Sequence, residues 1–536
     1  YGAMLTEEVS AGLRAAGRTS PPGGVDGFPA VPSGFRAIVV GAGVGGLCAA
    51  ANLAAAGVPY LQFERNDTVG GTWLDNAYPG AGVDTPNHLY SFSFAPHDWT
   101  QYFSLRDELH GYLERVSRDL DLRKGIRFGC EVVAAEYDEG SQTWRVDYRE
   151  PDGDLGSATA DVVISAVGAF NPPVSPDIPG LEDFAGDCYH TARWPRDAVI
   201  DGRRVGVIGS GASAMQLVPE IADRVAELTV FQRTPQWAAP FEQFRRDVPA
   251  PVRFLLREVP LYRVWYRLRL GWTFNDRIHP ALQKDPEWEH PDRAVNARND
   301  AFRRYFTRYV ESELRERTDL LEAVVPTYPP YGKRILLDNG WFSTVCRDDV
   351  TLVPEAAAGV EGNRVRTASG ARYELDVLIL ATGFDVSRFV STYDVRGRGG
   401  RSLGAEWGDD GRAYLGCTVP GFPNLFILYG PNLQAGHGGS LMFFLEAQMH
   451  YVMGLLRRMV EQDLASIEMR DEVCREYNDR LDELHESMIW THPGMTTYYR
   501  NSQGRVVVPT PLRVVDFWNL TRRPDLDAYR LEPRRG

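Results

Sequence analysis

The sequence predicts an α/β protein with two Rossmann-like dinucleotide-binding domains, the second inserted in the first and carrying a helical subdomain. Two glycine-rich turns, at residues 41–46 and 209–214, each follow a β-branched run and open an Ala-rich helical stretch. Apolar runs at residues 161–168 and 376–383 are each expected to end one of the two units. A third stretch, residues 241–325, is dense in Arg, Leu and aromatic residues at helical spacing, which predicts the helical subdomain.

The first unit is predicted from a strand, a helix and a second strand at residues 36–40, 45–56 and 60–64. Gly41 makes the turn, Gly43 lets the backbone approach a pyrophosphate, and Gly46 lets the helix pack closely on the strand. Glu64 ends the second strand, where a carboxylate accepts hydrogen bonds from ribose hydroxyls and repels a 2′-phosphate. We therefore expect FAD rather than NADP in this unit.

The second unit has basic and hydroxyl side chains where the first unit has an acidic one. Its turn offers a matching set of small cofactor-binding residues: Gly209, Gly211, Ser213 and Ala214. Arg233 and Thr234 stand where the first unit has its acid, and a guanidinium with a hydroxyl suits a 2′-phosphate. We therefore expect NADPH here, although an isolated Arg at a strand end is usually solvated, and a single glycine motif can also be an ordinary tight turn.

The chain passes between the units near residues 170 and 384. We expect an FAD-binding domain at 34–170 and 384–536, an NADP-binding domain at 171–383, and the helical insertion at 241–325. Residues 1–33 are rich in Gly, Pro, Ala and Ser without sustained periodicity, so we expect a disordered extension outside the folded domains.

Composition limits the function further. The chain has 536 residues, 43% of them hydrophobic, and a formal net charge of -14, which argues against a nucleic-acid binder. The sequence shows no membrane span, no secretory signal and no sign of an obligate protein partner, so we expect a cytoplasmic protein. Its six cysteines show neither a CxxC pair nor a zinc-ligand spacing, so no metal site is expected.

Between the two units, the chain carries a fingerprint of the form FxGxxxHxxxWP, made by Phe184, Gly186, His190 and Trp194. From about residue 34 to residue 518 the sequence resembles the type I Baeyer–Villiger monooxygenases, a group of class B flavoprotein monooxygenases. Further similarity lies at residues 70–73, 78–84, 333–334, 381–383, 430–432 and 436–438. The resemblance implies that the fingerprint residues couple the two domains rather than perform chemistry.

The resemblance implies an enzyme in which NADPH reduces FAD, O2 adds to the flavin C4a carbon, and the resulting peroxide attacks a ketone. The product is an ester or a lactone. It further implies that Arg334 keeps the peroxide anionic and that Asp84 holds and tunes Arg334; a guanidinium stays charged at working pH, so its contribution is electrostatic. An Asp after a glycine-rich turn can also be a simple loop cap.

The remaining residues also follow from the resemblance. Lys333, one of three lysines in the chain, is expected to reach the 2′-phosphate with Arg233 and Thr234. Gly82 stands where many relatives carry arginine, which predicts a more pliable loop around Asp84. The other expected cofactor contacts are Gly71, Thr72, Trp73, Val133, Ala381, Thr382, Gly383 and Asn432.

Three questions stay open at this level. Tyr499 and Asn501 lie in a stretch that closes over the nicotinamide in the family, but ordinary loop flexibility would look the same. The apolar insertion hints at a bulky apolar ketone of secondary metabolism. The alternatives are a flavin monooxygenase that oxidises sulfur or nitrogen, and a non-catalytic, redox-sensing flavoprotein.

Overall fold

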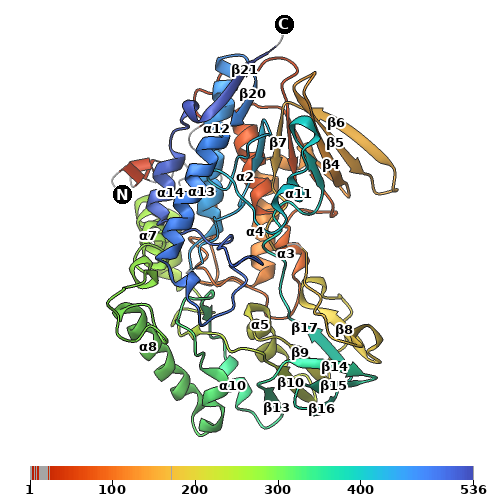
Figure 1. Ribbon diagram of the computed structural model, residues 1–536, viewed down its shortest axis with the longest axis vertical. Coiled ribbons are helices and arrows are strands. Elements are labelled where there is room, and N and C mark those ends of the chain that lie inside the picture. Colours follow the sequence, from red (N-terminus) through yellow and green to blue (C-terminus); the bar gives the residue numbers. More distant parts are fainter. Residues whose placement is uncertain are drawn as a thin grey trace.

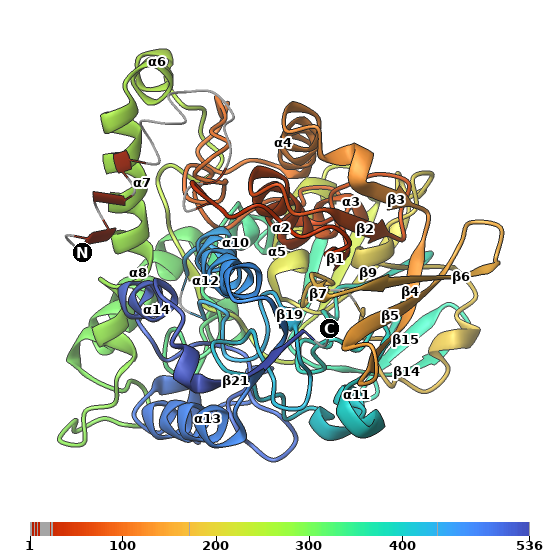
Figure 2. The same ribbon diagram turned by 90° about the horizontal axis from the view of Figure 1, so that it is seen from above.

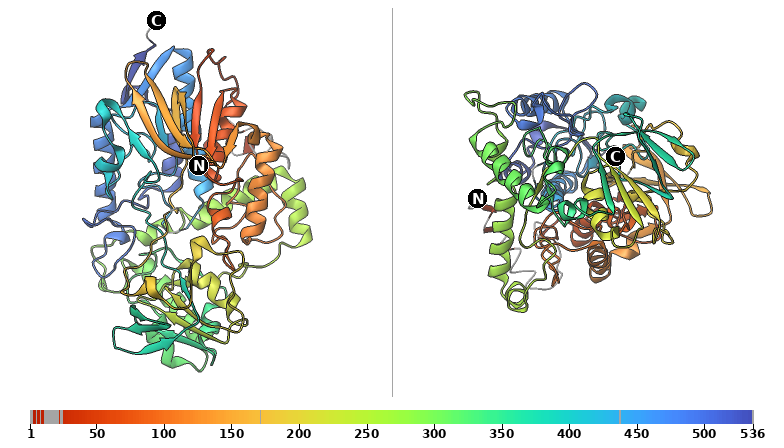
Figure 3. Two further views of the ribbon diagram at one scale, coloured as in Figure 1. Left: turned by 90° about the vertical axis from the view of Figure 1, so that its right-hand side faces the viewer. Right: turned by 90° about the horizontal axis from the view of Figure 1, so that it is seen from below.

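The computed structural model of the chain describes residues 3–4, 6–7, 9–10, 22, 25–170, 172–436 and 438–534. It confirms the predicted α/β fold class, because two parallel five-stranded sheets form two separate units. The first sheet lies in the upper part of the molecule and the second in the lower part (Figure 1). Seen from the side, the two units lie one above the other and are joined by chain segments (Figure 3, left).

The first sheet forms around the first glycine turn. All four residues of β1 (Ala37–Val40) are buried, as expected for a parallel strand covered on both faces. The chain continues through α2 (Val44–Ala55) into β2 (Tyr60–Glu64), which pairs parallel with β1. The strand order is β19-β7-β1-β2-β3, and the remaining strands β19, β7 and β3 lie at Leu425–Ile427, Val162–Ser165 and Ile126–Phe128. The turn after β1 therefore opens at the carboxyl edge of the sheet, where such folds bind ligands.

The second sheet repeats this plan around the second glycine turn. It runs from β9 (Arg204–Ile208) through α5 (Ala212–Ile221) into β10 (Glu227–Phe231). The strand order is β13-β10-β9-β17-β8, with the remaining strands at Val350–Val353, Val377–Leu380 and Asp187–His190. The edge strand β8 belongs to the fingerprint, so this motif is part of the second sheet rather than of a free linker.

The second unit is inserted in the first, as predicted. β19 follows the whole second sheet in the chain, yet it pairs parallel with β7 of the first sheet. The two crossing segments run side by side, because Val174 N–H donates to Gly383 O at 2.9 Å and Asp385 N–H donates to Pro172 O at 3.0 Å. The domain boundaries at residues 170 and 384 stay predictions, although the two crossing segments contact each other at residues 172–174 and 383–385.

Smaller elements complete both units. The insertion contains α6 (Ala250–Glu258), α7 (Pro260–Phe274), α8 (Ala297–Leu314) and α9 (Leu321–Val324). The other helices are α3 (Thr72–Asp75), α4 (Arg106–Asp119), α10 (Trp341–Val345), α11 (Leu403–Trp407), α12 (Leu441–Glu461), α13 (Asp471–Glu486) and α14 (Val514–Thr521). An added sheet has the order β18-β4-β5-β6, at Asp394–Arg396, Glu131–Asp138, Thr143–Arg149 and Leu155–Ala160. The remaining strands are β11–β12 (Ala238–Ala239, Leu336–Leu337), β14–β16 (Ala357–Glu361, Arg364–Thr367, Arg372–Glu374) and β20–β21 (Leu464–Met469, Tyr529–Pro533).

Helix α12 is the longest element of the first unit in the described part of the chain. It reaches Glu461, and 13 of its 21 residues are buried because it packs between α2 and α14. It is therefore a core helix of the first unit. Within the described residues, no helix has the length and apolar character needed to cross a membrane.

The end of the N-terminal segment differs from expectation. Val25 is buried, Arg457 of α12 donates to the carbonyls of Asp26 and Gly27 at 3.0 and 2.8 Å, and its guanidinium lies over the Phe28 ring. Residues 25–28 thus pack on the folded body because Val25 and Phe28 supply apolar surface. The rest of the expectation for residues 1–33 falls largely on residues 1, 2, 5, 8, 11–21, 23 and 24, which lie outside the described residues.

The first glycine turn supports a stability prediction. A Cβ on Gly46 would overlap the carbonyl oxygen of Gly41 and lie 2.6 Å from Nε2 of Gln62, whereas one on Gly45 would meet its nearest atoms at 3.5 Å. We expect Gly46→Ala to destabilise the protein by about 2 kcal/mol or more and to lower the Tm by several degrees. Differential scanning fluorimetry checks this, with Gly45→Ala as the matched control; equal Tm values for the two variants would contradict it.

Candidate functional site

A cavity of about 380 Å³ lies at the carboxyl edge of the first sheet and extends to the second unit. Ala212 and Gln216 of α5 line it from the second unit, and Arg334 reaches it from the segment before β12. Among the residues expected to bind cofactor or to act in catalysis, those that line it are Gly41, Gly43, Glu64, Gly71, Thr72, Trp73, Asp84 and Arg334. The cavity is thus the place where the two units meet.

The glycine turn fits a pyrophosphate. A Cβ on Gly41, which has φ +98°, would lie 2.7 Å from Ala166 O, and one on Gly71 would lie 2.9 Å from the Cα of Gly43. Gly43 caps α2 without any side-chain hydrogen bond, so the first N–H groups of the helix face the cavity uncapped. The strand-facing side is therefore closed to side chains and the cavity side offers donors to an anion.

Glu64 lies at the end of β2, as predicted, and is buried. Its carboxylate accepts the Ala42 N–H at 2.6 Å and the Asn66 N–H at 2.9 Å. Burial raises the pKa of Glu64, and these two N–H bonds partly oppose that rise. Each carboxylate oxygen keeps a further lone pair, so Glu64 can still accept a hydroxyl from the cavity.

Arg334 and Asp84 form a two-pronged ion pair on the cavity wall. Nε of Arg334 donates to Oδ2 of Asp84 at 2.5 Å, and Nη2 donates to Oδ1 at 2.7 Å. Burial would raise the pKa of Asp84, but the charge and hydrogen bonds of Arg334 hold it below its usual range. A third bond runs from Nη1 to the carbonyl of Ala435 at 3.2 Å. Because a guanidinium has five N–H donors, two remain for a ligand in the cavity.

Three tyrosines that sequence reasoning did not select surround this pair. Tyr90, Tyr429 and Tyr498 all line the cavity, and Tyr90 accepts the indole N–H of Trp73 at 3.1 Å. Burial is the largest cause that raises the pKa of each, so all three stay neutral hydrogen-bonding groups. The sequence signal that could have pointed to Tyr498 was its position beside Tyr499. The walls beside Arg334 are therefore aromatic with polar tips.

A second cluster carries the expected 2′-phosphate residues. Ser210 Oγ donates to the carbonyl of Thr234 at 3.1 Å, which ties the second glycine turn to the end of β10. Burial first, and the nearby charge of Arg233 second, lower the pKa of Lys333 to about 8. In the described part of the chain, neither Lys333 nor Arg233 has a carboxylate within ion-pair distance. Two like charges are thus brought together without a protein anion between them.

The rest of the second turn resembles the first. A Cβ on Gly209, which has φ +113°, would lie 2.5 Å from Ala381 O, and Gly211 caps α5 without a side-chain bond. Ala214 is fully buried, and Ser213 interacts with the hydroxyl of Tyr78. This turn therefore fits a second pyrophosphate, although its glycines do not line the cavity described above.

The fingerprint lies at the crossing between the units. Nδ1 of His190 accepts the Ala192 N–H at 3.0 Å, and its Nε2 is 3.3 Å from Oγ1 of Thr382. Thr382 in turn donates to Val174 O at 2.5 Å. Phe184 is buried, Trp194 packs edge-on against Tyr189, and a Cβ on Gly186 would overlap Asp376 O. His190 thus joins β8 to the segment at residues 381–383, and its role in coupling stays a prediction.

Several expected residues lie away from the cavity. Val132 lines it instead of Val133, and Gly46 lies behind the turn, against Gly41 and Gln62. Gly82 is held on two sides, because Val83 N–H donates to Ser104 O and Gln216 Nε2 donates to Gly82 O at 2.9 Å. Hydrogen bonds to Ser104 and to Gln216 of α5 therefore hold the loop that is predicted to be pliable, and Gly82 itself lines the cavity.

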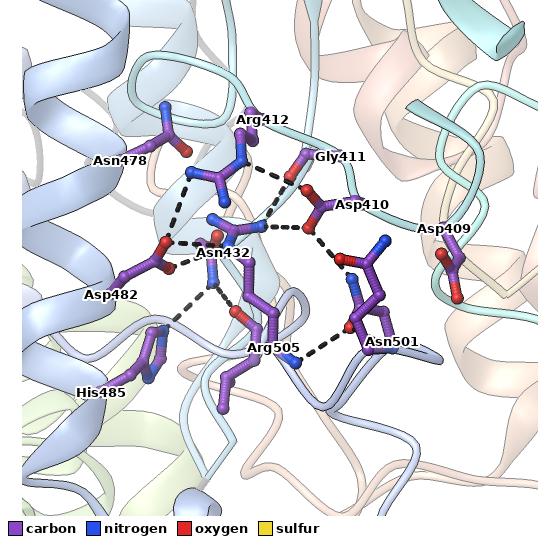
Figure 4. A network of polar contacts seen from close by, with 12 residues as sticks. Asp409, Asp410, Gly411, Arg412, Asn432, Asn478, Asp482, His485, Asn501 and Arg505 are labelled. Carbon is purple, nitrogen blue, oxygen red and sulfur yellow. Dashed lines mark hydrogen bonds and ion pairs between the residues drawn. The ribbon is translucent and has the colours of Figure 1, made fainter. Parts of the chain in front are cut away.

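Asn432 also differs from expectation, since it belongs to a buried polar network (Figure 4). Its Nδ2 donates to the carbonyls of Val506 and Pro509 at 3.0 and 3.2 Å and lies 3.2 Å from Nε2 of His485. Burial lowers the pKa of His485 to about 3, so that ring is neutral. The wider network contains Asp410, Arg412, Asp482, Asn501 and Arg505.

This network holds the loop at residues 494–506. Arg505 binds Asp482 of α13 at 2.9 Å and Asp410 at 3.1 Å, and Asn501 donates to Asp410 at 3.0 Å. Tyr499 is fully buried and donates to Gly436 O at 2.9 Å, while Tyr498 lines the cavity. Tyr499 and Asn501 thus position the loop, and His437 of the 436–438 motif lies outside the described residues.

Comparison with known proteins shows that this chain is similar to flavin-dependent monooxygenases. A family model described as FMO-like, flavin-binding monooxygenase-like, matches residues 34–241. The uncharacterized monooxygenase y4iD of Sinorhizobium fredii is 48% identical over 94% of this chain and 76% of its own length. A Baeyer–Villiger monooxygenase of Streptomyces coelicolor is 35% identical over 92% of each chain. The structure of OTEMO in complex with FAD and NADP has a TM-score of 0.81 and 26% identity, covering 94% of this chain and 100% of that one.

The Asn432 network supports a second prediction. Asn432→Asp keeps the shape and tolerates the observed φ of 55°, but it replaces the Nδ2 donor with an acceptor oxygen that faces two carbonyl oxygens. We expect destabilisation by about 2 kcal/mol and faster tryptic cleavage after Arg500 or Arg505. Thermal unfolding and timed digestion measure both effects, with the exposed Asn519→Asp as control. An unchanged cleavage rate in the Asn432 variant would show that the network does not hold the loop.

Proposed function

Because the chain belongs to the Baeyer–Villiger monooxygenase family, we propose that it uses NADPH, FAD and O2 to convert a ketone into an ester or lactone. One oxygen atom enters the bond next to the carbonyl, the other leaves as water, and NADPH supplies the two electrons. The observation that carries the proposal is the Asp84–Arg334 pair on the wall of a cavity shared by both units. A bulky apolar ketone fits the aromatic lining beside it.

The residues present fit FAD in the first unit. Gly41, Gly43 and Gly71 leave room for a pyrophosphate, and Glu64 can accept hydroxyl groups of a ribose. When bound, the flavin would supply the chemistry that activates O2. OTEMO, whose structure is similar to this chain, binds FAD and NADP, which supports the same assignment.

Arg334 would stabilise negative charge that develops on oxygen during the reaction. At about 4 Å and an effective dielectric constant of about 20, a unit charge pair interacts by roughly 4 kcal/mol. Asp84 binds Nε and Nη2, which fixes the orientation of the guanidinium and leaves its remaining N–H groups toward the cavity. Asp84 thus acts as a positioning residue, and Arg334 as the fixed positive charge.

Lys333 and Arg233 would hold the 2′-phosphate of NADPH. Their mutual repulsion is relieved when an anion binds between them, which gives NADPH an advantage over NADH. Thr234, three residues after the end of β10, can add a hydroxyl.

A ketone panel tests the function. With NADPH and O2, cyclic and polycyclic ketones should gain one oxygen atom by mass, and Arg334→Ala should lower product formation about 100-fold while NADPH is lost to hydrogen peroxide. The exposed Arg308→Ala is the control. Products from thioethers or amines alone would favour the sulfur- or nitrogen-oxidising alternative. No product from any of these substrates would favour a redox-sensing flavoprotein, and normal, coupled product formation in the Arg334 variant would reject its role.

The pH dependence tests the NADPH site. Lys333 is cationic below its pKa of about 8 and neutral above it, so kcat/KM for NADPH should fall as pH rises through about 8. NADH lacks the phosphate and should show no such fall. In Lys333→Arg the guanidinium stays charged, so the fall should disappear. Steady-state kinetics between pH 6 and 10 measure this, and the same fall with NADH would contradict the assignment.

A further inference from the structure

Helix α7 carries an apolar stripe on an outer face of the molecule. Leu261, Trp265 and Trp272 are 55%, 51% and 49% exposed, and their spacing of four and seven residues places them on one side of the helix. Phe254 and Leu255 of the adjoining α6 are also exposed. Figure 2 shows α6 and α7 as an arm along one edge of the molecule. Contiguous apolar surface of this kind marks an interaction site.

The charge of this arm is opposite to that of the whole protein. Residues 250–277 contain six arginines and two carboxylates, in a chain of net charge -14. The guanidinium of Arg269 lies 5.3 Å from the ring of Trp265, and that of Arg277 lies 5.8 Å from the ring of Trp272. Neither arginine forms an ion pair with a described residue. Each exposed Trp of the stripe thus has a cation beside it.

We propose that the α6–α7 arm docks this protein on an anionic lipid surface. Trp side chains favour the headgroup level of a bilayer, leucines enter the acyl region, and arginines bind anionic headgroups. The rest of the protein is negatively charged and is repelled by such a surface, so the basic arm is the part that faces it. Charge complementarity and the Trp–Arg pairs favour lipid over a second protein.

A second cavity lies behind the stripe. It has a volume of about 480 Å³ and is lined by Trp265, Leu268, Trp272 and other mainly apolar side chains. Leu89 and Ser440 line this second cavity, whereas their chain neighbours Tyr90 and Gly439 line the cavity at Arg334. The two cavities thus have neighbouring walls, and, resting on the proposed function, we infer that an apolar ketone dissolved in the bilayer enters on this side of the molecule.

Vesicle binding tests the docking without any enzymatic reaction. The full-length protein should co-sediment with vesicles of phosphatidylcholine and phosphatidylglycerol, and much less with phosphatidylcholine alone. The triple variant Leu261→Gln/Trp265→Gln/Trp272→Gln should bind about tenfold more weakly. Arg269→Gln/Arg277→Gln should lower binding to the anionic vesicles and its dependence on salt. Leu155→Gln is the control, because Leu155 lies on β6 and is 70% exposed. This variant should bind like the wild type.

Three outcomes would overturn the proposal: no binding of the wild type to anionic vesicles, equal binding of the triple variant, or equal loss in the Leu155 control. Light scattering after size-exclusion chromatography tests whether a second copy of the chain binds the stripe instead. If the wild type forms a dimer but does not bind vesicles, and the triple variant is a monomer, the stripe is a dimer interface. Failure of the ketone reaction would leave vesicle binding unchanged, so the two proposals fail separately.

Discussion

The ion pair between Asp84 and Arg334 is the contact on which the shared cavity depends. Asp84 follows α3 in the first unit and Arg334 precedes β12 in the second, 250 residues later in the chain. A partly buried carboxylate or guanidinium loses hydration, which its partner compensates, and this pair forms only when both units are correctly placed. Hydrogen bonds beside it hold that placement, from Tyr78 to Gln216 at 2.7 Å and from Gln216 to Gly82. The position of the positive charge is thus a property of two folded units together.

Local sequence was sufficient for much of this architecture. The glycines of both turns are needed because a Cβ there would meet backbone oxygens. The spacing of the glycine motif in the sequence already predicts this close backbone approach. The strands beside them are continuous apolar runs, which predict buried parallel strands. Glu64 and Arg233 could likewise be placed by counting from each turn, since strand length fixes where the next strand ends. These predictions depend on contacts within about thirty residues.

The rest of the site depends on contacts between distant segments. Asn432 and Tyr429 are three residues apart and both have positive φ, yet one enters the buried network and the other lines the cavity. No periodic pattern predicts a left-handed backbone at a tyrosine, so sequence reasoning selected Asn432 and missed Tyr429. Tyr498 was missed for a related reason: Arg505 of the same loop is bound by Asp482, which lies on α13. Side-chain direction in loops is set by such distant partners.

The negative net charge and the anionic cofactors are compatible because electrostatic effects at the surface are local. At physiological ionic strength, screening limits the electrostatic effect of an exposed carboxylate to a range of about 8 Å. The net charge of the chain therefore does not describe the electrostatic potential at any one site. Lys333 stands near Arg233, and repulsion from that arginine helps to lower its pKa. On α7 and just after its end, Arg269 and Arg277 lie beside aromatic rings instead of carboxylates. The net charge excludes a polyanion that would cover the whole surface, but small anions and headgroups respond to the nearest cations. The proposed 2′-phosphate site and the proposed docking arm therefore share one feature: their cations stand close together, or on aromatic surface, without a carboxylate paired to them.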